Sequence, residues 1–150
     1  MTQEWSPRMK LSTKSRYGAR ILVELAKHHD RGTPVQVSEI ARIQEIPVKY
    51  LEQLIRLLRL AGLVESVRGP KGGHLLTTPP HKITLGQVVR IFEGQEELVE
   101  CVGKPEACGK SSTCRFREAW REATEALYDN LDRVRISDLM GDTTGPCGEK

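Results

Sequence analysis

Three of the four cysteines in the chain lie within a stretch of 14 residues, at Cys101, Cys108 and Cys114. Six and then five residues separate them, and glycines and a proline interrupt the stretch, so we expect a loop rather than a helix face. A short loop can fold three sulfurs around one centre, which a regular helix or strand at this spacing cannot. Thiolates are soft ligands for transition metals and are also oxidised readily. The spacing therefore predicts a metal centre or a redox-active group of thiols.

The composition bounds the kind of protein that carries these cysteines. The 150 residues are 38% hydrophobic and 29% charged, as in an ordinary water-soluble domain. A chain of this length can bury one hydrophobic core, and we do not expect two independent domains. No apolar run approaches the roughly 20 residues that span a bilayer, and the polar start lacks the apolar core of a signal peptide. We therefore expect a cytoplasmic protein with no membrane partner. Cytoplasmic thiols are kept reduced, which favours metal or redox chemistry over a structural disulfide.

Charge is distributed unevenly along the chain. Residues 1–80 carry 13 Lys and Arg against 7 Asp and Glu, a net charge of +6, whereas residues 81–150 carry 10 against 13, a net charge of −3. A basic front half indicates a polyanionic partner, and nucleic acid is the first expectation for a small cytoplasmic protein.

Helical spacing of apolar residues predicts three helices in the front half. The first begins at Ser12-Thr13 and ends near residues 28–32. Ser38 caps a short second helix whose inner face is Ile40, Ala41 and Ile43. A tight turn at residues 45–47 follows, because Pro47 disfavours the helical conformation in the residue before it. The third helix starts near Val48, stops at Gly62, and buries its apolar positions Leu51, Leu54, Ile55 and Leu58.

This order of elements predicts a helix-turn-helix followed by a wing. Two strands are expected around the turn Gly-Pro-Lys-Gly-Gly at residues 69–73. The candidate DNA-binding residues lie on the helix pair, on the outer face of its second helix and at the basic tip of the wing: Ser38, Lys49, Tyr50, Gln53, Arg56, Arg68 and Lys71. The alternative is an ordinary surface hairpin beside two packed helices.

The second half predicts two further helices on either side of the cysteines. Thr84 caps a helix that closes at Gly94, and from Arg115 an apolar stripe continues for about 20 residues, or roughly 30 Å of helix. A single long stripe at the end of a small domain needs a partner, and a second copy of the chain is the simplest one. Burial against its own domain is the alternative. The stripe comprises Phe116, Trp120, Ala123, Leu127, Leu131 and Val134.

The predicted fold class is therefore mainly α, a winged helix-turn-helix DNA-binding domain with a long C-terminal dimerisation helix. We expect a disordered extension at residues 1–9, the DNA-binding domain at 10–80, the cysteine loop and dimerisation helices at 81–140, and a disordered tail at 141–150.

The chain resembles the IscR and NsrR family of winged-helix regulators from residue 9 to about residue 140. The motifs that carry the resemblance are MKLSTKSRY (residues 9–17), YLEQ (50–53), LVESVRGPKGGHL (63–75) and the three cysteines followed by Trp120. The resemblance implies a homodimer that binds palindromic promoter DNA and holds a 2Fe–2S or 4Fe–4S cluster in the cysteine loop, with 2Fe–2S preferred. It further implies that Glu52 discriminates between classes of DNA site.

The fourth ligand of such a cluster does not carry over from the family. Arg117 stands where some members have a histidine, and Arg16 and Arg20 stand where others supply a carboxylate or histidine from the partner subunit. Arginine stays protonated and is a poor ligand. Water, a small molecule or one of three side chains remain as alternatives: Glu100, Glu118 and Cys147.

The sequence thus predicts a homodimeric transcription regulator, acting as a repressor, whose promoter binding is set by an iron–sulfur cluster. The alternatives are a zinc- or thiol-dependent regulator of the same fold, a carrier protein of iron–sulfur assembly that does not bind DNA, and a regulator that acts by forming a complex with a metabolic enzyme. No nucleophile–base pair, phosphate-binding loop or paired carboxylates indicate an enzyme.

Overall fold

The computed structural model describes residues 11–94, 100–107, 109–110 and 112–141. The predicted extension at 1–9 and most of the predicted tail lie outside the described residues. The helices and strands in this part of the chain are, in order, α1 (Thr13–Ala26), α2 (Val37–Gln44), α3 (Val48–Leu60), β1 (Val64–Val67), β2 (Gly73–Leu76), η1 (Pro80–Lys82), α4 (Leu85–Glu93), α5 (Glu100–Gly103), η2 (Pro105–Ala107), α6 (Arg115–Arg133) and η3 (Ile136–Leu139). The predicted mainly helical, winged helix-turn-helix architecture is confirmed.

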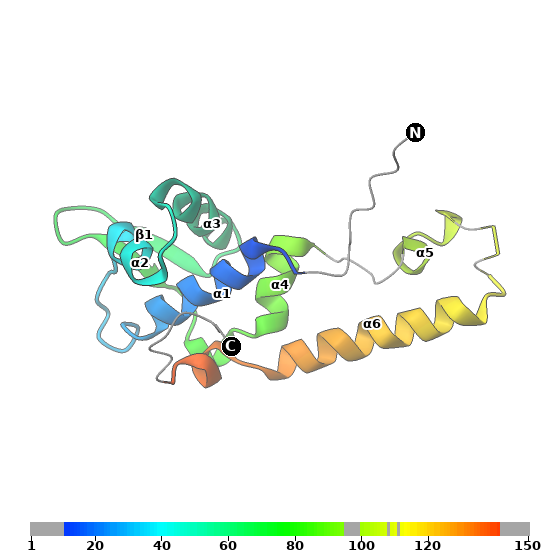
Figure 1. Cartoon of the computed structure of the whole chain (residues 1–150). Helices are drawn as coiled ribbons and strands as arrows, with labels where there is room; N and C mark the ends of the chain where they lie inside the picture. Colours follow the sequence, from blue (N-terminus) through cyan, green and yellow to red (C-terminus); the bar gives the residue numbers. More distant parts are fainter. Residues whose placement is uncertain (1–10, 95–99, 108, 111, 142–150) are drawn as a thin grey trace.

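One core holds together the head of the molecule, which comprises α1 to α4, the two strands and η3 (Figure 1). Its largest fully buried side chains come from α1, α2, α3, α4, η3 and the link between η1 and α4. They are aliphatic, as the apolar spacing predicts: Ile21, Leu22, Leu25, Ile40, Leu51, Leu54, Leu58, Ile83, Val88 and Ile136. Burying a side chain of this size contributes about 1.5–3 kcal/mol. The apolar faces of these short helices are therefore satisfied within the head itself.

The turn between α2 and α3 is fixed by backbone geometry. Glu45 adopts a left-handed conformation with φ of 55°, and the Ile46 amide donates to the Ala41 carbonyl at 3.1 Å. Pro47 then precedes α3. This left-handed residue ends α2 and redirects the chain, so that α3 crosses α2 with Ile40 and Ala41 buried between them.

Two details of α2 differ from the sequence prediction. Ser38 is the second residue of the helix rather than its cap, and Gln36 is the cap. The backbone of Val35 pairs with His74 of β2, so Gln36 follows in an extended conformation and the helix begins at Val37. Ile43 is 43% exposed instead of facing inward, because α2 turns only Ile40 and Ala41 towards the core.

The wing is a two-stranded antiparallel hairpin in which Val64 pairs with Leu76 and Val67 pairs with Gly73. Val64 and Leu76 are buried at the base, which anchors the hairpin to the head. Gly73 passes so close to the Val35 carbonyl that an added Cβ would lie 2.5 Å from its oxygen. This close approach allows the Val35–His74 bridge, which attaches the hairpin to the segment that leads into α2.

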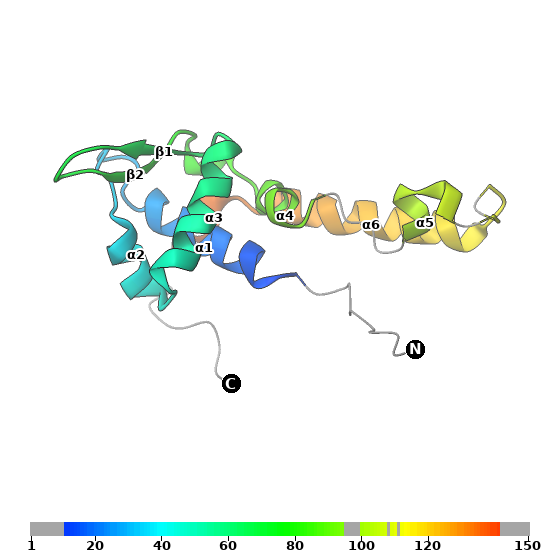
Figure 2. The same ribbon diagram turned by 90° about the horizontal axis from the view of Figure 1, so that it is seen from above.

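The joint between the head and α6 is formed by α4, the last turn of α6 and the residues that follow it. The Thr84 hydroxyl caps α4 by accepting from the Gln87 amide at 3.1 Å, as predicted. Arg90 donates to both carboxylate oxygens of Asp132, at 2.6 and 2.9 Å. The Leu85 amide donates to the Val134 carbonyl at 2.8 Å. These contacts fix the C-terminal end of α6, while the rest of this 19-residue helix extends away from the head (Figures 1 and 2).

Candidate nucleic-acid interface and cysteine segment

The outer face of α3 is basic and exposed. Lys49, Gln53 and Arg56 follow one another at helical spacing on this face, and all three are exposed. None of the three forms an ion pair within the described part of the chain. Their charges and amide are therefore available to an external partner. A helix of this shape fits the major groove of DNA, where lysine and arginine bind phosphates and glutamine pairs with an adenine edge.

Tyr50, in the first turn of α3, already has partners within the head. Its ring packs edge-on against Tyr17 of α1, with ring centroids 6.1 Å apart, and its hydroxyl lies 3.1 Å from the Thr13 hydroxyl. The Arg20 guanidinium lies over the Tyr17 ring, 5.6 Å from its centroid. Tyr50 is consequently half-buried, and its hydroxyl links the start of α1 to the start of α3.

The tip of the wing carries the two predicted cations. Arg68 and Lys71 are both exposed, and neither has an ion-pair partner among the residues that the structure describes. Gly69 has a φ of 109°, which L-residues rarely adopt, so glycine suits this turn. An exposed arginine at such a tip could enter a narrow minor groove.

A groove of about 530 Å³ separates α3 from β1. Its walls are Arg56, Arg59 and Leu60 on the helix and Val64, Glu65 and Ser66 on the strand. Sequence reasoning missed Arg59, although its spacing of three residues from Arg56 on a helix could have indicated a shared face. The groove brings these two arginines together beside the wing.

The pKa of His74, on β2, responds to charged residues of α3 beside this groove. Burial lowers the pKa of its imidazole, the charge of Arg59 lowers the pKa further, and the charge of Glu52 opposes them. The ring nitrogen Nδ1 lies 3.3 Å from the Ser66 hydroxyl. Glu52 is exposed, and its charge acts on the wing strand as well as on the face of α3.

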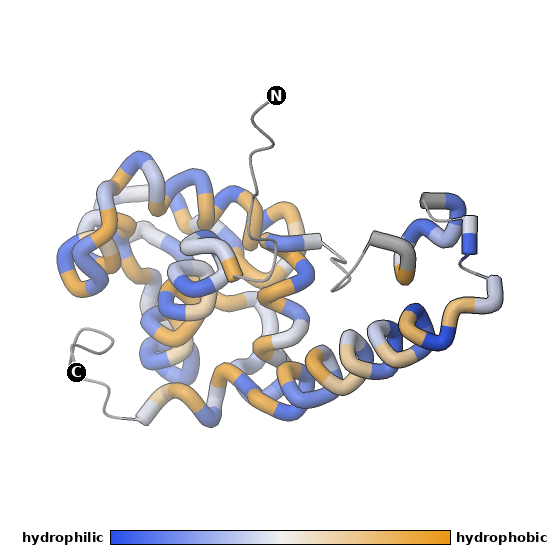
Figure 3. The backbone as a smooth tube through the Cα atoms, turned by 45° about the vertical axis from the view of Figure 1, so that its right-hand side comes forward, coloured by the Kyte–Doolittle hydropathy of each residue, from blue (hydrophilic) through white to orange (hydrophobic). Residues whose placement is uncertain are grey.

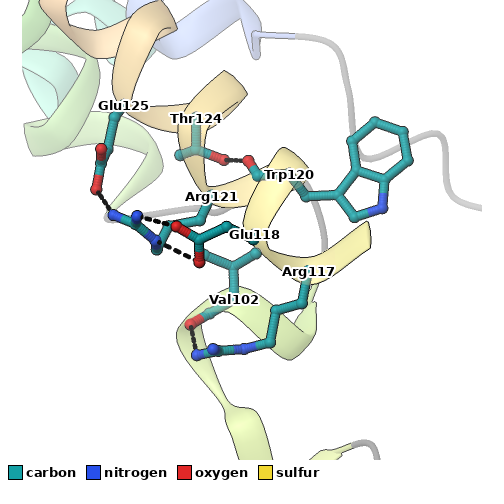
Figure 4. Close-up of polar contacts among 7 residues, drawn as sticks. All are labelled: Val102, Arg117, Glu118, Trp120, Arg121, Thr124 and Glu125. Carbon is teal, nitrogen blue, oxygen red and sulfur yellow. Dashed lines mark hydrogen bonds and ion pairs between the residues drawn. The ribbon is translucent and has the colours of Figure 1, made fainter. Parts of the chain in front are cut away.

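The cysteine segment lies beside the far end of α6, where α5 packs along the helix (Figures 1 and 2). Cys101 is the second residue of α5, and half-buried Cys114 is the residue that caps α6. The Arg117 guanidinium donates to the Val102 carbonyl at 3.5 Å, which ties the two helices together (Figure 4). The side chain of Cys101, the whole of Cys108 and Cys147 lie outside the described residues. The structure thus brings the backbone of Cys101 and Cys114 to neighbouring helices, and the predicted three-sulfur centre stays a prediction.

Most of the apolar stripe of α6 is exposed. Phe116 is 75% exposed, Trp120 45% and Leu127 44%, and Ala123 is exposed as well. Figure 3 shows apolar and polar positions alternating along the helix outside the head. The buried residue of α6 is Thr124, whose hydroxyl donates to the Trp120 carbonyl at 2.8 Å. The head therefore does not bury Phe116, Trp120 and Leu127 of this stripe.

The two ends of the predicted stripe are placed differently. Leu131 is half-buried near the joint, and Val134 lies beyond the last helical residue, where its carbonyl accepts from Leu85. On the polar side of α6, Arg121 pairs with both Glu118 and Glu125, and the Trp120 indole points away from this group (Figure 4). The helix thus has a charged face satisfied by its own ion pairs and an apolar face without cover in the described chain.

Comparison with known proteins identifies the family. Residues 11–142 match the sequence model of Rrf2, described as an iron-dependent transcriptional regulator. The chain belongs to the Rrf2 family. The resemblance deduced from the sequence motifs is confirmed at this level, and the expectation that the chain is not an enzyme agrees with a family described as transcriptional regulators.

Three Rrf2-family relatives illustrate the match. Protein rrf2 of Nitratidesulfovibrio vulgaris is 42% identical over 136 residues, which cover 91% of this chain and 90% of the relative. The solved structure of CymR, the global cysteine regulator of Bacillus subtilis, is 38% identical, with a TM-score of 0.74 over 90% of this chain and 98% of CymR. The structure of IscR from T. potens is 33% identical, with a TM-score of 0.71 over 89% and 88% of the two chains.

These similarities establish DNA-binding transcription regulation by a winged helix as the function of this Rrf2-family chain. These relatives differ in the role that their names give, since one is named a global cysteine regulator and another an IscR. Among the described residues, no helix is both long enough and apolar enough to cross a membrane.

Proposed function

We propose that the chain is a homodimeric repressor whose promoter binding is controlled by an iron–sulfur cluster held by Cys101, Cys108 and Cys114. The observation that carries the proposal is the placement of two of these cysteines on α5 and α6, which pack against each other outside the head. Three thiolates form the main part of a cluster ligand set, and Lys104, Lys110 and Arg115 nearby in the sequence favour their ionised form. When bound, the cluster supplies iron that oxidants and nitric oxide can attack.

The protein's own residues would transmit the state of this centre. The segment that carries the cysteines begins directly after α4 and ends at the first residue of α6, so ordering it would act on both helices that meet at the Arg90–Asp132 joint. A change there alters the spacing or the rigidity of two DNA-binding heads in a dimer. The affinity of the two heads for a palindromic DNA site would change as a result.

Homodimerisation is supported by the exposed stripe of α6. The unpaired apolar surface of Phe116, Trp120 and Leu127 on a helix of about 28 Å matches the seam of a helix pair. In such a dimer the recognition helices would lie roughly 34 Å, or a multiple of it, apart, which predicts a palindromic operator.

The test of the cluster is the visible spectrum, with iron and sulfide content, of protein purified without oxygen. A brown protein with stoichiometric sulfide, bleached by nitric oxide or air, is expected. Cys108→Ala should abolish the visible absorbance while the far-UV circular dichroism stays unchanged, and Thr113→Ala, in the same stretch but without a thiol, serves as the control. Full absorbance in Cys108→Ala would exclude the proposed ligand set.

A thiol or zinc switch is the second candidate, because clustered thiolates also bind zinc and are oxidised readily. It predicts a colourless protein, with zinc or without metal, whose DNA affinity changes on oxidation. The conclusion that the chain binds DNA would still stand after this outcome, because the family and the fold support it independently.

The DNA face is tested with operator fragments selected from random sequence. Gln53→Ala should lose about 1–3 kcal/mol of discrimination at one base position. Arg59→Gln should weaken all sequences equally and reduce the slope of log K against log salt by about 0.9, because one phosphate contact is lost. Glu65→Gln, on the opposite wall of the same groove, is the matched control and should not weaken binding.

A further inference from the structure

Glu93, the last residue of α4, is bound to the first turn of α1. One of its carboxylate oxygens accepts from the Ser12 amide at 2.7 Å, from the Ser12 hydroxyl at 2.6 Å and from the Ser15 hydroxyl at 2.6 Å. Ser12 is the cap residue of α1, yet its hydroxyl makes no cap hydrogen bond within its own helix. The cap of α1 is therefore supplied by another helix, in the position where a negative charge stabilises a helix start.

The carboxylate at this position is held in its ionised form. Burial alone would raise the pKa of Glu93, but the hydrogen bonds from Ser12 and Ser15 and the charge of Lys14 together lower it. Ser15 is 2% exposed, so its hydroxyl has little access to water as an alternative partner. Releasing Glu93 would leave these donors poorly satisfied and loosen the first turn of α1.

The same turn of α1 contacts the recognition helix on its other side. Thr13 follows Ser12 directly, and its hydroxyl meets the Tyr50 hydroxyl at 3.1 Å. Tyr50 is next to Lys49 and three residues before Gln53, which we place against DNA. A continuous series of contacts thus joins Glu93 to Ser12, Thr13 and Tyr50, from the end of α4 to the beginning of α3.

We propose that Glu93 and Thr13 are positioning residues for DNA binding, and that the first turn of α1 transmits the state of the cysteine segment to the recognition helix. The argument rests on the proposed function, since Glu93 is eight residues before Cys101 and ends the helix from which that segment continues. A shift at the end of α4 moves the carboxylate, loosens Ser12 to Ser15, and changes the position of Tyr50 at the DNA face. Contacts in series of this kind have measurable coupling energies.

A double-mutant cycle tests the connection. Glu93→Gln, Tyr50→Phe and the double variant are compared for affinity to one selected operator, in protein isolated without oxygen. Each single change should weaken binding by about 3- to 10-fold, and the double variant should be no weaker than the weaker single variant, because either change breaks the same series. Thr13→Val, which removes only the intermediate hydroxyl, should behave in the same way. Effects of Glu93→Gln and Tyr50→Phe that simply multiply would overturn the proposal.

The matched control is Glu122→Gln, the same substitution at an exposed carboxylate of α6 that has no place in the proposed series or in the candidate ligand set. It should leave operator affinity unchanged. Melting temperatures of all variants separate a loss of fold from a loss of positioning.

A second readout would not respond to a merely structural role. The ratio of operator affinities between metal-loaded and metal-free protein should move towards one in Glu93→Gln. An unchanged ratio in Glu93→Gln would overturn transmission through this turn. A ratio of one in the wild-type protein would instead overturn cluster control, and the double-mutant cycle would still decide whether the contacts position the recognition helix.

Discussion

The head and α6 bury their apolar residues in opposite ways. In the head, Leu51, Leu54 and Leu58 are at most 1% exposed, whereas on α6 Phe116, Trp120 and Leu127 are 44–75% exposed. The two regions have similar helical periodicity, so the difference lies in what surrounds them. The head is complete as a single chain, while α6 leaves apolar surface that the proposed second copy of the chain would cover. Stability of the head should therefore be independent of protein concentration, and the contribution of the α6 stripe should depend on it.

The same substitution in the two regions gives the largest contrast. Leu58→Ala should cost about 2–5 kcal/mol of unfolding free energy, because Leu58 is fully buried and a cavity remains. Leu127→Ala should cost little in dilute protein and should instead weaken dimerisation. Denaturant unfolding at two concentrations tenfold apart, with sedimentation equilibrium, measures both. A concentration-independent loss in Leu127→Ala would contradict the division between the regions.

Gly18 tests how closely α1 and α4 pack within the head. A Cβ at this position would lie 2.1 Å from the Phe92 ring, so Gly18→Ala should destabilise by about 1–3 kcal/mol despite the better helix propensity of alanine. Thermal unfolding measures the loss. Phe92→Leu in the same chain should recover part of it, and Gly141→Ala, where no neighbouring atom lies within 4 Å, should be neutral. Stabilisation by Gly18→Ala would mean that the two helices separate easily.

The Arg90–Asp132 joint between the two regions predicts a pH dependence. Hydrogen bonds from Arg90 hold the pKa of the Asp132 carboxyl below its ordinary value. Its stabilisation is thus fully present above the unfolded pKa of about 3.9 and is lost as pH falls through the lower folded pKa. Both side chains are more than a third exposed, so Asp132→Asn should cost only about 0.5–1 kcal/mol at pH 7.

The pH dependence is checked by measuring the melting temperatures of Asp132→Asn and wild type from pH 7 to pH 2. The two curves should converge at the acid end. Glu122→Gln, an exposed carboxylate on the same helix, should follow wild type throughout. A constant difference in melting temperature between Asp132→Asn and wild type down to pH 2 would show that the charge of Asp132 does not stabilise the joint.

The smallest effect is expected on the charged face of α6. Arg121 pairs with Glu118 and Glu125 at the surface, with side chains 40–59% exposed, and solvent and salt screen ion pairs of this kind. Arg121→Gln should leave the melting temperature unchanged within about 1 °C, both at low salt and at 1 M salt. A clear loss would indicate that this face, as well as the apolar stripe, is covered in the assembled protein.

Local patterns in the sequence were sufficient for the architecture. The helical spacing of Leu51, Leu54, Ile55 and Leu58 and the glycines of the wing predicted the helix pair and the hairpin, because both signals lie within a few residues of the structure they specify. Membership of the family followed from motifs of the same local kind. The roles of individual residues in binding DNA or metal stay predictions.

Contacts between distant parts of the chain were not predictable in the same way. Glu93 and Ser12 are 81 residues apart, and no periodicity connects them. The expectation that Ser38 caps α2 was wrong because a bridge between Val35 and His74, set by the wing, decides where that helix starts. Arg59 was overlooked because its position beside the wing depends on how β1 returns along α3.

The joint at Arg90 and Asp132 has a mechanical consequence, because α6 is held at one end and projects from the head. Its 19 residues form a helix of about 28 Å, with Cys114 at the end farthest from the joint. A rotation of about 5° at the joint displaces that far end by roughly 2.5 Å. A small rotation at the joint therefore becomes a larger displacement at the far end. A distance label near the far end of α6 would register movements of the head that are too small to detect within its own core.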